Sequence, residues 1–109
     1  MRIDFYKTRR GRSPVAEFIQ EQPAPLQAAI ARAFDRIEEH GLRGSGVSLR
    51  QLRGKLWEIR VQAGAAARVL YVLRTEVELV VLHAYRKQSQ KAPAREIDIA
   101  ESRMREVLE

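Results

Sequence analysis

The sequence predicts an α+β fold, in which a small antiparallel sheet packs against an N-terminal helical hairpin and a C-terminal helix follows. Three observations predict it: an opening stretch of alternating apolar and polar residues, two amphipathic helical stretches, and three consecutive strand-like runs from Leu52 onward. At 109 residues the chain can bury one hydrophobic core but not two, so we expect a single domain over residues 1–109.

The opening residues alternate as expected of a half-buried strand, with Ile3 and Phe5 on one side and Arg2 and Asp4 on the other. A basic segment, Lys7–Arg12, follows with four positive charges. Such a segment is either a solvated loop or a contact for RNA, and the sequence leaves both interpretations open.

A first helix is predicted to begin at Ser13 and Pro14. The serine hydroxyl can cap the first turn, and proline is preset for the first helical position. Val15, Phe18 and Ile19 give this helix an apolar stripe. Together with the helix that follows, it should form a hairpin lying on the sheet.

Two prolines interrupt the helical pattern, and a second, longer helix is expected from near Pro25. Gly41 favours the left-handed conformation and should end this helix after His40. His40 is expected to interact with the helix dipole, with a ligand or catalytic role as the alternative. Leu42–Ser48 contains two glycines and is predicted to be a flexible connector. The apolar stripe of the second helix consists of Leu26, Ala29, Ile30, Ala33, Phe34 and Ile37.

From Leu52 the apolar pattern changes to a period of two, which is typical of strands. Trp57, Ile59 and Val61 form an apolar face, and the residues between them, Glu58 among them, form a charged face. Because short turns separate the runs, the three strands should be adjacent and antiparallel. The predicted strands are Leu52–Val61, Ala67–Arg74 and Val77–Tyr85, with turns at Gln62–Ala65 and Thr75–Glu76.

A third helix is predicted near the end of the chain. Pro93 lies in its first turn, where a missing N–H does little harm. Ile97, Ala100, Met104 and Val107 form its apolar stripe. This helix either closes over the sheet or moves away from it.

Composition excludes several classes of protein. The chain has no cysteine, so disulfides and thiolate chemistry are excluded, and its two histidines are too far apart in sequence to suggest a metal site. No P-loop or dinucleotide-binding spacing is present, and we expect no cofactor. No apolar run approaches the roughly 20 residues that span a bilayer, so we expect a cytoplasmic protein without a membrane partner. The net charge of +6 favours a polyanionic partner.

Arg60 and Arg68 flank the turn at Gln62–Ala65, so antiparallel pairing can place them close together on neighbouring strands. Two adjacent guanidinium groups make a strong site for a phosphodiester, because each can donate parallel hydrogen bonds to its oxygens. The alternative is two unrelated surface arginines. Both belong to a set of basic and aromatic residues that adjacent strands can bring together: Lys55, Trp57, Arg60, Arg68, Tyr71, His83, Tyr85, Arg86, Lys87 and Lys91.

The stretches Leu52–Arg60, Arg68–Tyr71, His83–Pro93 and Glu96–Arg103 resemble the RelE/HigB toxin superfamily, and most of all its phage-derived HigB-like branch. The resemblance covers nearly the whole chain, because the opening strand and the helical hairpin agree in order and length. It implies a RelE/ParE-like fold and a toxin of a type II toxin–antitoxin pair. Such a toxin cuts messenger RNA without a metal, usually on the ribosome.

The resemblance places the active-site positions of the family at Lys55, Arg60, Arg68, Tyr85 and Lys87. Cleavage without a metal requires a deprotonated 2′-hydroxyl, stabilised charge at phosphorus and a protonated leaving oxygen. We expect the two arginines to stabilise the charge and Lys87 to contact phosphate or act as the acid. Lys55 or Tyr85 removes the proton, provided that neighbouring cations depress its pKa.

The aromatic residues of this set differ in their expected roles. His83 has a suitable intrinsic pKa but lies in an apolar strand, so both a structural and a catalytic role stay open. Trp57 is expected in the core, whereas Tyr85, beside two cations, is the expected base-stacking residue.

Two further classes of function stay open: a ParE-like inhibitor of DNA gyrase, and an RNA-binding module without catalysis. In the toxin interpretation, the partners are messenger RNA, the ribosome and a helix-turn-helix antitoxin whose acidic or amphipathic segment complements the positive charge. The chain lacks a recognition helix of its own, so we expect contact with DNA only through the antitoxin.

Overall fold

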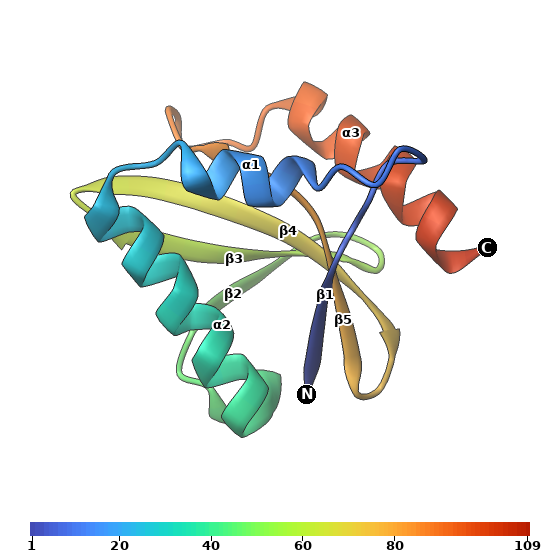
Figure 1. The fold of residues 1–109 in the computed structure, drawn as a ribbon, viewed down its shortest axis with the longest axis horizontal. Coiled ribbons are helices and arrows are strands. Elements are labelled where there is room, and N and C mark those ends of the chain that lie inside the picture. Colours follow the sequence, from blue (N-terminus) through green and yellow to red (C-terminus); the bar gives the residue numbers. More distant parts are fainter.

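The computed structural model describes residues 1–109 and contains five strands and three helices (Figure 1). The α+β fold class expected from the sequence is confirmed. In chain order the elements are β1 (Arg2–Phe5), α1 (Pro14–Gln20), α2 (Ala24–Gly44), β2 (Ser48–Arg53), β3 (Leu56–Ala63), β4 (Ala65–Thr75), β5 (Glu78–Arg86) and α3 (Ala94–Leu108).

All five strands belong to one sheet, in the order β1-β5-β4-β3-β2. Strands β2 to β5 pair antiparallel with their chain neighbours, because each connection is a short turn. The opening strand differs: β1 pairs parallel with β5, with Arg2 opposite Glu78 and Phe5 opposite Val81. It forms one edge of the sheet, and β2 forms the other.

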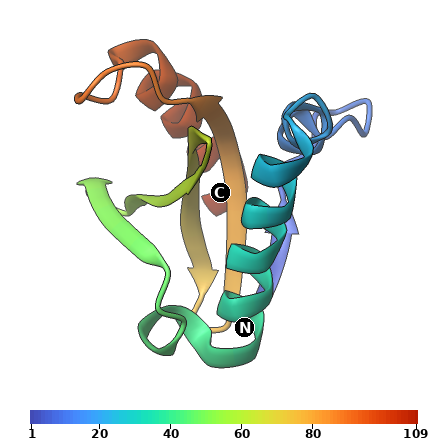
Figure 2. The ribbon, with the colours of Figure 1, turned by 90° about the vertical axis from the view of Figure 1, so that its left-hand side faces the viewer.

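Helices cover both faces of the sheet (Figure 2). On one face, here called the hairpin face, α1 and α2 pack on a core cluster of thirteen buried residues. Leu26, Ile30 and Ile37 of α2 are completely or almost completely buried there against Ile59, Val69 and other strand residues. The apolar stripes read from the sequence are therefore the surfaces that seal this face.

The opposite face, here called the α3 face, has a smaller core of six buried residues. Ala100 of α3 packs there against the strand residues Leu56, Leu70, Val72, Val80 and Leu82. Polar contacts also hold α3: Arg53 pairs with Glu101 at 2.9 Å, and the Arg103 guanidinium donates to the carbonyl of Leu82. The terminal helix thus closes over the sheet.

The helix boundaries follow the predicted signals. Ser13 caps α1, because its Oγ accepts a hydrogen bond from the backbone N–H of Ala16, and Pro14 is the first helical residue. Gly41 interrupts α2 with φ +73°, at the position where the helix was expected to end, and one more turn follows it to Gly44. None of the helices is both long enough and apolar enough to cross a lipid bilayer.

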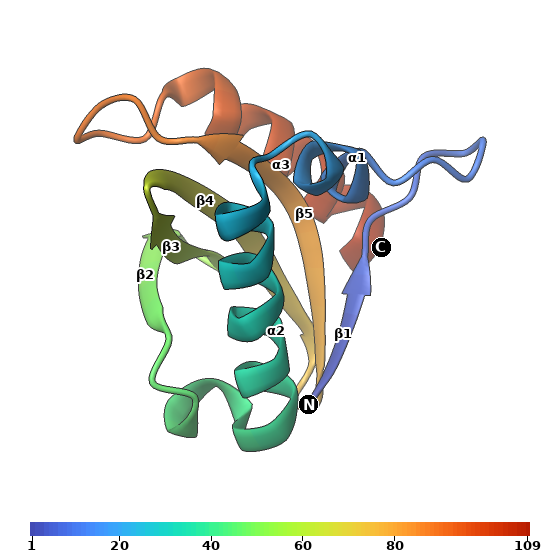
Figure 3. The same ribbon diagram turned by 60° about the vertical axis from the view of Figure 1, so that its left-hand side comes forward.

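The sequence-based interpretation missed one strand. The stretch from Leu52 to Val61, expected to be a single strand, is broken by a tight turn at Gly54 and Lys55, where Gly54 has φ +54°. Residues Ser48–Arg53, before this turn, form β2, which lies at the sheet edge (Figure 3). Ser48 was expected at the end of the connector and Leu52 and Arg53 in the single strand, and the residues between them had no predicted element. The hairpin of β2 and β3 adds Arg50 and Leu49 to the two faces of the sheet.

Candidate functional site

Arg60 and Arg68 lie directly opposite each other on β3 and β4, as the antiparallel pairing predicted. Residues opposite one another in an antiparallel pair project from the same face, so both guanidinium groups belong to the α3 face. Arg60 is exposed, whereas Arg68 is 9% exposed. The sheet thus supplies one exposed and one buried cation beside each other.

Tyr85 extends this row onto β5, where it is the partner of Arg68. The position depends on an irregularity in the ladder: Val81 faces Tyr71, but His83 faces Leu70, so one residue of β5 is extra. Such a bulge turns the following side chains to the other face of the sheet. Without it, Ala84 would lie opposite Arg68 and Tyr85 would point into the hairpin face.

Glu58 lies two residues before Arg60 on the same face of β3 and is only 2% exposed. Its Oε2 lies 3.9 Å from Nε of Arg68 and 3.6 Å from Nε of Arg50. Glu58 lies on the charged face that the strand pattern predicted, but it is buried there. Strand periodicity gives the face correctly, but the neighbouring strands and α3 cover this part of it. Two arginines compensate the buried carboxylate, which unpaired would be strongly destabilising.

These side chains line a small cleft of about 50 Å³, which we call the arginine cleft. This volume is well below the roughly 300–1,000 Å³ of pockets that enclose a drug-sized ligand, so the cleft suits a single phosphate group better than a whole nucleotide. Glu58 is the one carboxylate in its lining. The lining residues are Arg50, Glu58, Arg60, Arg68, Tyr85, Lys87, Ser89, Gln90 and Ala92.

The loop after β5 closes one side of the arginine cleft. Its first residue, Lys87, continues the ladder, because its backbone N–H donates to the carbonyl of Ala66 at 2.9 Å. Ser89 Oγ donates to the carbonyl of Lys91, which holds the tip of the loop. Lys87 therefore reaches the cleft from a backbone position that is fixed, as its predicted role as a phosphate contact requires.

The environment of Tyr85 raises its pKa. Burial is the main cause, the negative charge of Glu58 adds to it, and the positive charge of Arg68 opposes it. The condition under which Tyr85 was expected to act as a base, a pKa depressed by neighbouring cations, is therefore not met. A neutral phenol at this position is a hydrogen-bond donor.

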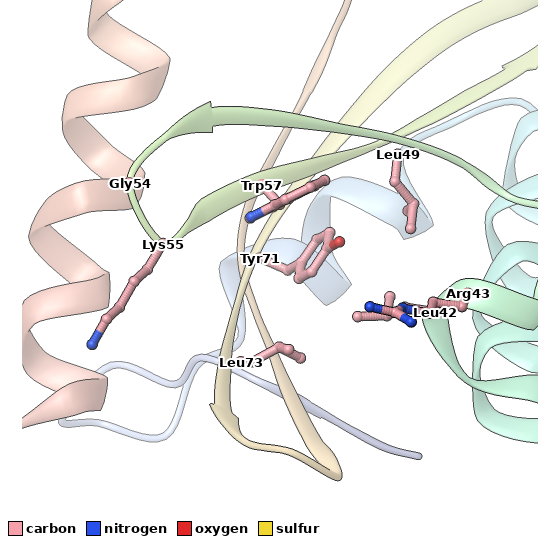
Figure 4. Close-up of a pocket in the computed structure, with 8 residues that line it drawn as sticks. All are labelled: Leu42, Arg43, Leu49, Gly54, Lys55, Trp57, Tyr71 and Leu73. Carbon is pink, nitrogen blue, oxygen red and sulfur yellow. The ribbon is translucent and has the colours of Figure 1, made fainter.

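Lys55 is not part of the arginine cleft. It lies in the turn between β2 and β3, five residues before Arg60, which along an extended strand is a distance of about 17 Å. Trp57 and Tyr71 project from the hairpin face, and burial raises the pKa of Tyr71 to about 12. All three line a second, larger cavity on the hairpin face (Figure 4).

His83 lies under α3 and not in the lining of the arginine cleft. Its Nε2 is 2.6 Å from Oε1 of Glu96, its Nδ1 is 3.4 Å from the Arg103 guanidinium, and its ring stacks on Tyr85. Burial lowers the pKa of His83, and this effect outweighs the opposing influence of Glu96. These contacts favour a structural role, in which His83 fastens α3 to β5 and supports the ring of Tyr85.

The remaining cations of the predicted set lie around this region without lining the cleft. Arg86 turns to the hairpin side and donates to Oε1 of Gln22 at 3.1 Å. Lys91 is exposed at the tip of the loop. Sequence reasoning missed Arg50, because it lies on the unrecognised strand β2, where it is the cross-strand partner of Glu58.

Fold and site together define a class: a small α+β protein whose sheet presents a cationic cleft sized for phosphate, with one carboxylate and one phenol in reach. The family model for phage-derived Gp49-like proteins (DUF891) matches residues 17–105, which is most of the chain. The chain therefore belongs to the Gp49-like family, which is associated with toxins of toxin–antitoxin systems. A comparison with curated proteins found no match.

Proposed function

We propose that this protein is the toxin of a type II toxin–antitoxin system and acts as a metal-independent endoribonuclease on messenger RNA. The observation that carries the proposal is the arginine cleft, in which Arg60 and Arg68 lie side by side with Glu58 and Tyr85. Family membership and the resemblance to RelE/HigB toxins support it.

The two arginines bind the scissile phosphate and stabilise the charge that develops on it. Guanidinium groups donate paired hydrogen bonds to phosphate oxygens, and they do so most strongly where water is limited. Arg68 is held by its ion pair with Glu58 and by a hydrogen bond to the carbonyl of Ala67. A donor that is already oriented stabilises the transition state without further reorganisation.

Glu58 is the candidate base in this mechanism. It takes the proton of the ribose 2′-hydroxyl, and the 2′-oxygen attacks phosphorus as the bond to the 5′-oxygen breaks. A proton from the Tyr85 phenol neutralises the leaving 5′-oxygen, with the ammonium of Lys87 as the alternative donor. The products are a 2′,3′-cyclic phosphate and a free 5′-hydroxyl, so protons and charge balance without any co-reactant.

We further propose that the ribosome presents the messenger and that an antitoxin restrains the toxin. The arginine cleft is small, so it binds a single phosphate of the messenger RNA. A ribosome that holds the rest of the messenger in place would raise the effective concentration of the bond to be cleaved. The net charge of +6 suits an acidic or amphipathic segment of a helix-turn-helix antitoxin.

The proposal is tested with purified protein, translating ribosomes and a messenger that carries a single 2′-deoxynucleotide at the cleavage site. Wild-type protein should cut the all-ribose messenger in the presence of a metal chelator and leave the 2′-deoxy messenger intact at that site. Arg60→Ala and Arg68→Ala should each lower the cleavage rate by about 10²- to 10³-fold, the usual cost of removing one oriented donor. Cleavage of the 2′-deoxy messenger at the same rate would refute the mechanism.

Following messenger and DNA after induction in cells separates this function from the two alternatives. Broken DNA with intact messenger would point to gyrase inhibition, and RNA binding without cleavage or toxicity would point to a binding module. The combination of a carboxylate and a phenol with the paired arginines favours chemistry over binding alone.

A further inference from the structure

The arginine cleft is closed at one end and open at the other. Toward α3 the side chains of this face are covered: Glu58 is buried, and His83 is held by Glu96 of the helix at 2.6 Å. In the opposite direction β3 and β4 end in their connecting turn, and α3 lies away from this turn (Figure 1). A nucleotide next to a phosphate bound by Arg60 and Arg68 therefore has room on the side of the turn.

Beyond the two arginines, the next row of residues on this face consists of Gln62, Ala66 and Lys87. Gln62 lies opposite Ala66 on the neighbouring strand, and the backbone N–H of Lys87 donates to the carbonyl of Ala66 at 2.9 Å. Residues two apart on a strand project from the same face, so Gln62 follows Arg60 and Lys87 follows Tyr85. The short side chain of Ala66 leaves an open floor between the two longer ones.

The ring of Tyr85 has one occupied face and one free face. His83, two residues earlier on β5, stacks on it with ring centroids 6.2 Å apart and planes inclined by 26°. Because the two rings are nearly parallel and follow one another along the strand, the free face of Tyr85 is turned toward Lys87. Positions two apart on a strand are separated by about 7 Å, which leaves room for one further ring. A base stacked on the free face of Tyr85 would lie over Ala66.

Two side-chain amides border this space. Gln62 is exposed near the end of β3, and Gln90 is exposed in the loop after β5, where it lines the arginine cleft. Neither amide is hydrogen-bonded within the protein, whereas those of Gln22, Gln27 and Gln51 are. An amide is neutral and presents donors beside an acceptor, so it suits the edge of a nucleobase better than a phosphate.

We propose that Gln62 and Gln90 form a base-recognition subsite, which binds a nucleotide next to the scissile phosphate. The base stacks on Tyr85 over Ala66, and the two amides bind the hydrogen-bonding groups at its edges. This subsite gives the proposed ribonuclease a sequence preference, so the inference rests on the proposed function. The hydroxyl of Tyr85 lies in the plane of its ring, so stacking leaves it free to donate its proton.

A second backbone phosphate is the competing occupant of this space, because Lys87 lies at its border. Phosphate contacts position a nucleic acid but carry no sequence information. Substitution of a phosphate contact would therefore weaken the binding of all sequences equally. Substitution of a base contact would change the preference among bases.

The test measures base preference with and without cleavage. Messengers with randomised nucleotides are cut on translating ribosomes, and sequencing identifies the bases that flank each cut. In parallel, the full-length protein is titrated with short single-stranded oligonucleotides that differ in one base and have 2′-deoxyribose sugars, which block the proposed cleavage. NMR shifts report the affinity for each oligonucleotide and the residues that contact it.

Wild-type protein should discriminate between bases at one flanking position by about fivefold or more, as a good two-bond contact does. Gln62→Ala and Gln90→Ala should each reduce this discrimination, with thermal unfolding unchanged because both residues are exposed. Gln62→Glu leaves only acceptors, so it should shift the preference toward guanine, whose Watson–Crick edge presents two adjacent N–H donors. The matched control is Gln88, an exposed glutamine of the same loop that does not line the cleft. Neither Gln88→Ala nor Gln88→Glu should change the preference.

Three results would overturn the proposal: no base preference in the wild-type protein, a preference that both alanine variants keep, or a loss of affinity that is equal for all bases. The last result would assign the space to a phosphate. Failure of the proposed ribonuclease is a different result, in which the messenger stays intact while the oligonucleotides bind with a base preference that depends on Gln62 and Gln90.

Discussion

The two faces of the sheet use the same strands for different purposes. On the hairpin face, β3 contributes Ile59 and Val61 to a large apolar core, and on the α3 face the alternate residues Glu58 and Arg60 form a charged cleft. The side-chain period of two allows this separation. Stability is concentrated on one face, so the other can hold a buried carboxylate among cations. The comparison teaches that a single sheet can carry a charged cleft on one face without giving up the apolar core on the other.

The largest expected effect of a substitution is at Glu58, the buried carboxylate of the arginine cleft. Glu58→Gln keeps the shape of the side chain but removes its ability to accept a proton, so we expect messenger cleavage to fall by about 10²- to 10⁴-fold. Single-turnover cleavage on ribosomes measures this effect. The matched control is Glu101→Gln, the same change at a residue that pairs with Arg53 outside the cleft. A Gln variant at position 58 that cleaves like the wild type would remove Glu58 from the mechanism.

A second comparison concerns the stability supplied by each face. Ile37 of α2 is completely buried on the hairpin face, whereas Ile97 of α3 is only partly buried on the α3 face. Ile37→Ala should lower the free energy of unfolding by about 3 kcal/mol, because a filled core position becomes a cavity. Ile97→Ala should cost clearly less. Urea unfolding followed by circular dichroism measures both, and equal losses would show that the two faces share the stability evenly.

A further prediction concerns how the stability of the α3 face depends on pH. His83 of β5 contacts Glu96 of α3 and so holds this helix on the sheet. Burial depresses the pKa of His83 in the folded protein, so the unfolded chain binds its proton more readily. The stability that comes from neutral His83 is therefore complete above about pH 6.5 and is lost as the pH falls through the lower folded value. Each unit of difference corresponds to about 1.36 kcal/mol.

Urea unfolding between about pH 5 and pH 8 tests this prediction, with His83→Gln as the comparison. The wild type should lose stability toward the acidic end, and the variant should lose less. His40 is exposed and present in both proteins, so it does not contribute to the difference. Parallel pH profiles for the two proteins would contradict the prediction.

The smallest expected effect lies at the rim of the α3 face. Arg53 pairs with Glu101 at 2.9 Å, but the arginine is mostly exposed, so solvent screens the interaction. Arg53→Ala should lower the free energy of unfolding by about 0.5 kcal/mol, and the difference should shrink as salt is added. A salt-independent loss would show that packing of the arginine stem, and not its charge, holds this end of α3.

Periodicity and turn signals were sufficient to predict most of the fold. Features that depend only on neighbouring residues were predicted and are confirmed. They are the start of α1 at Ser13 and Pro14, the apolar stripe of α2 and the break in α2 at Gly41. Strand β2 was missed because its leucines, Leu49 and Leu52, are three residues apart and do not alternate. An edge strand with one exposed side carries a weak pattern, and its neighbours are what keep it extended.

The candidate site was predictable only in part, because several of its features also depend on neighbouring elements and not on the local sequence. Arg60 and Arg68 could be paired because the short turn between them fixes the register of β3 and β4. Lys55 seemed close in sequence, yet an extended strand carries it away from Arg60 within five residues. The burial of Glu58 depends on α3 and on β2, and the direction of Tyr85 depends on a bulge in β5. None of these leaves a signature in the local pattern.

The parallel pairing of β1 with β5 affects when the sheet can be completed during folding. Residues 2–5 are synthesised well before residues 78–81, with which they pair in the sheet. Proteins with such distant pairings fold late, because the intervening chain must be closed before the contact is gained. A nascent copy would thus complete its sheet only after residues 78–81 have emerged.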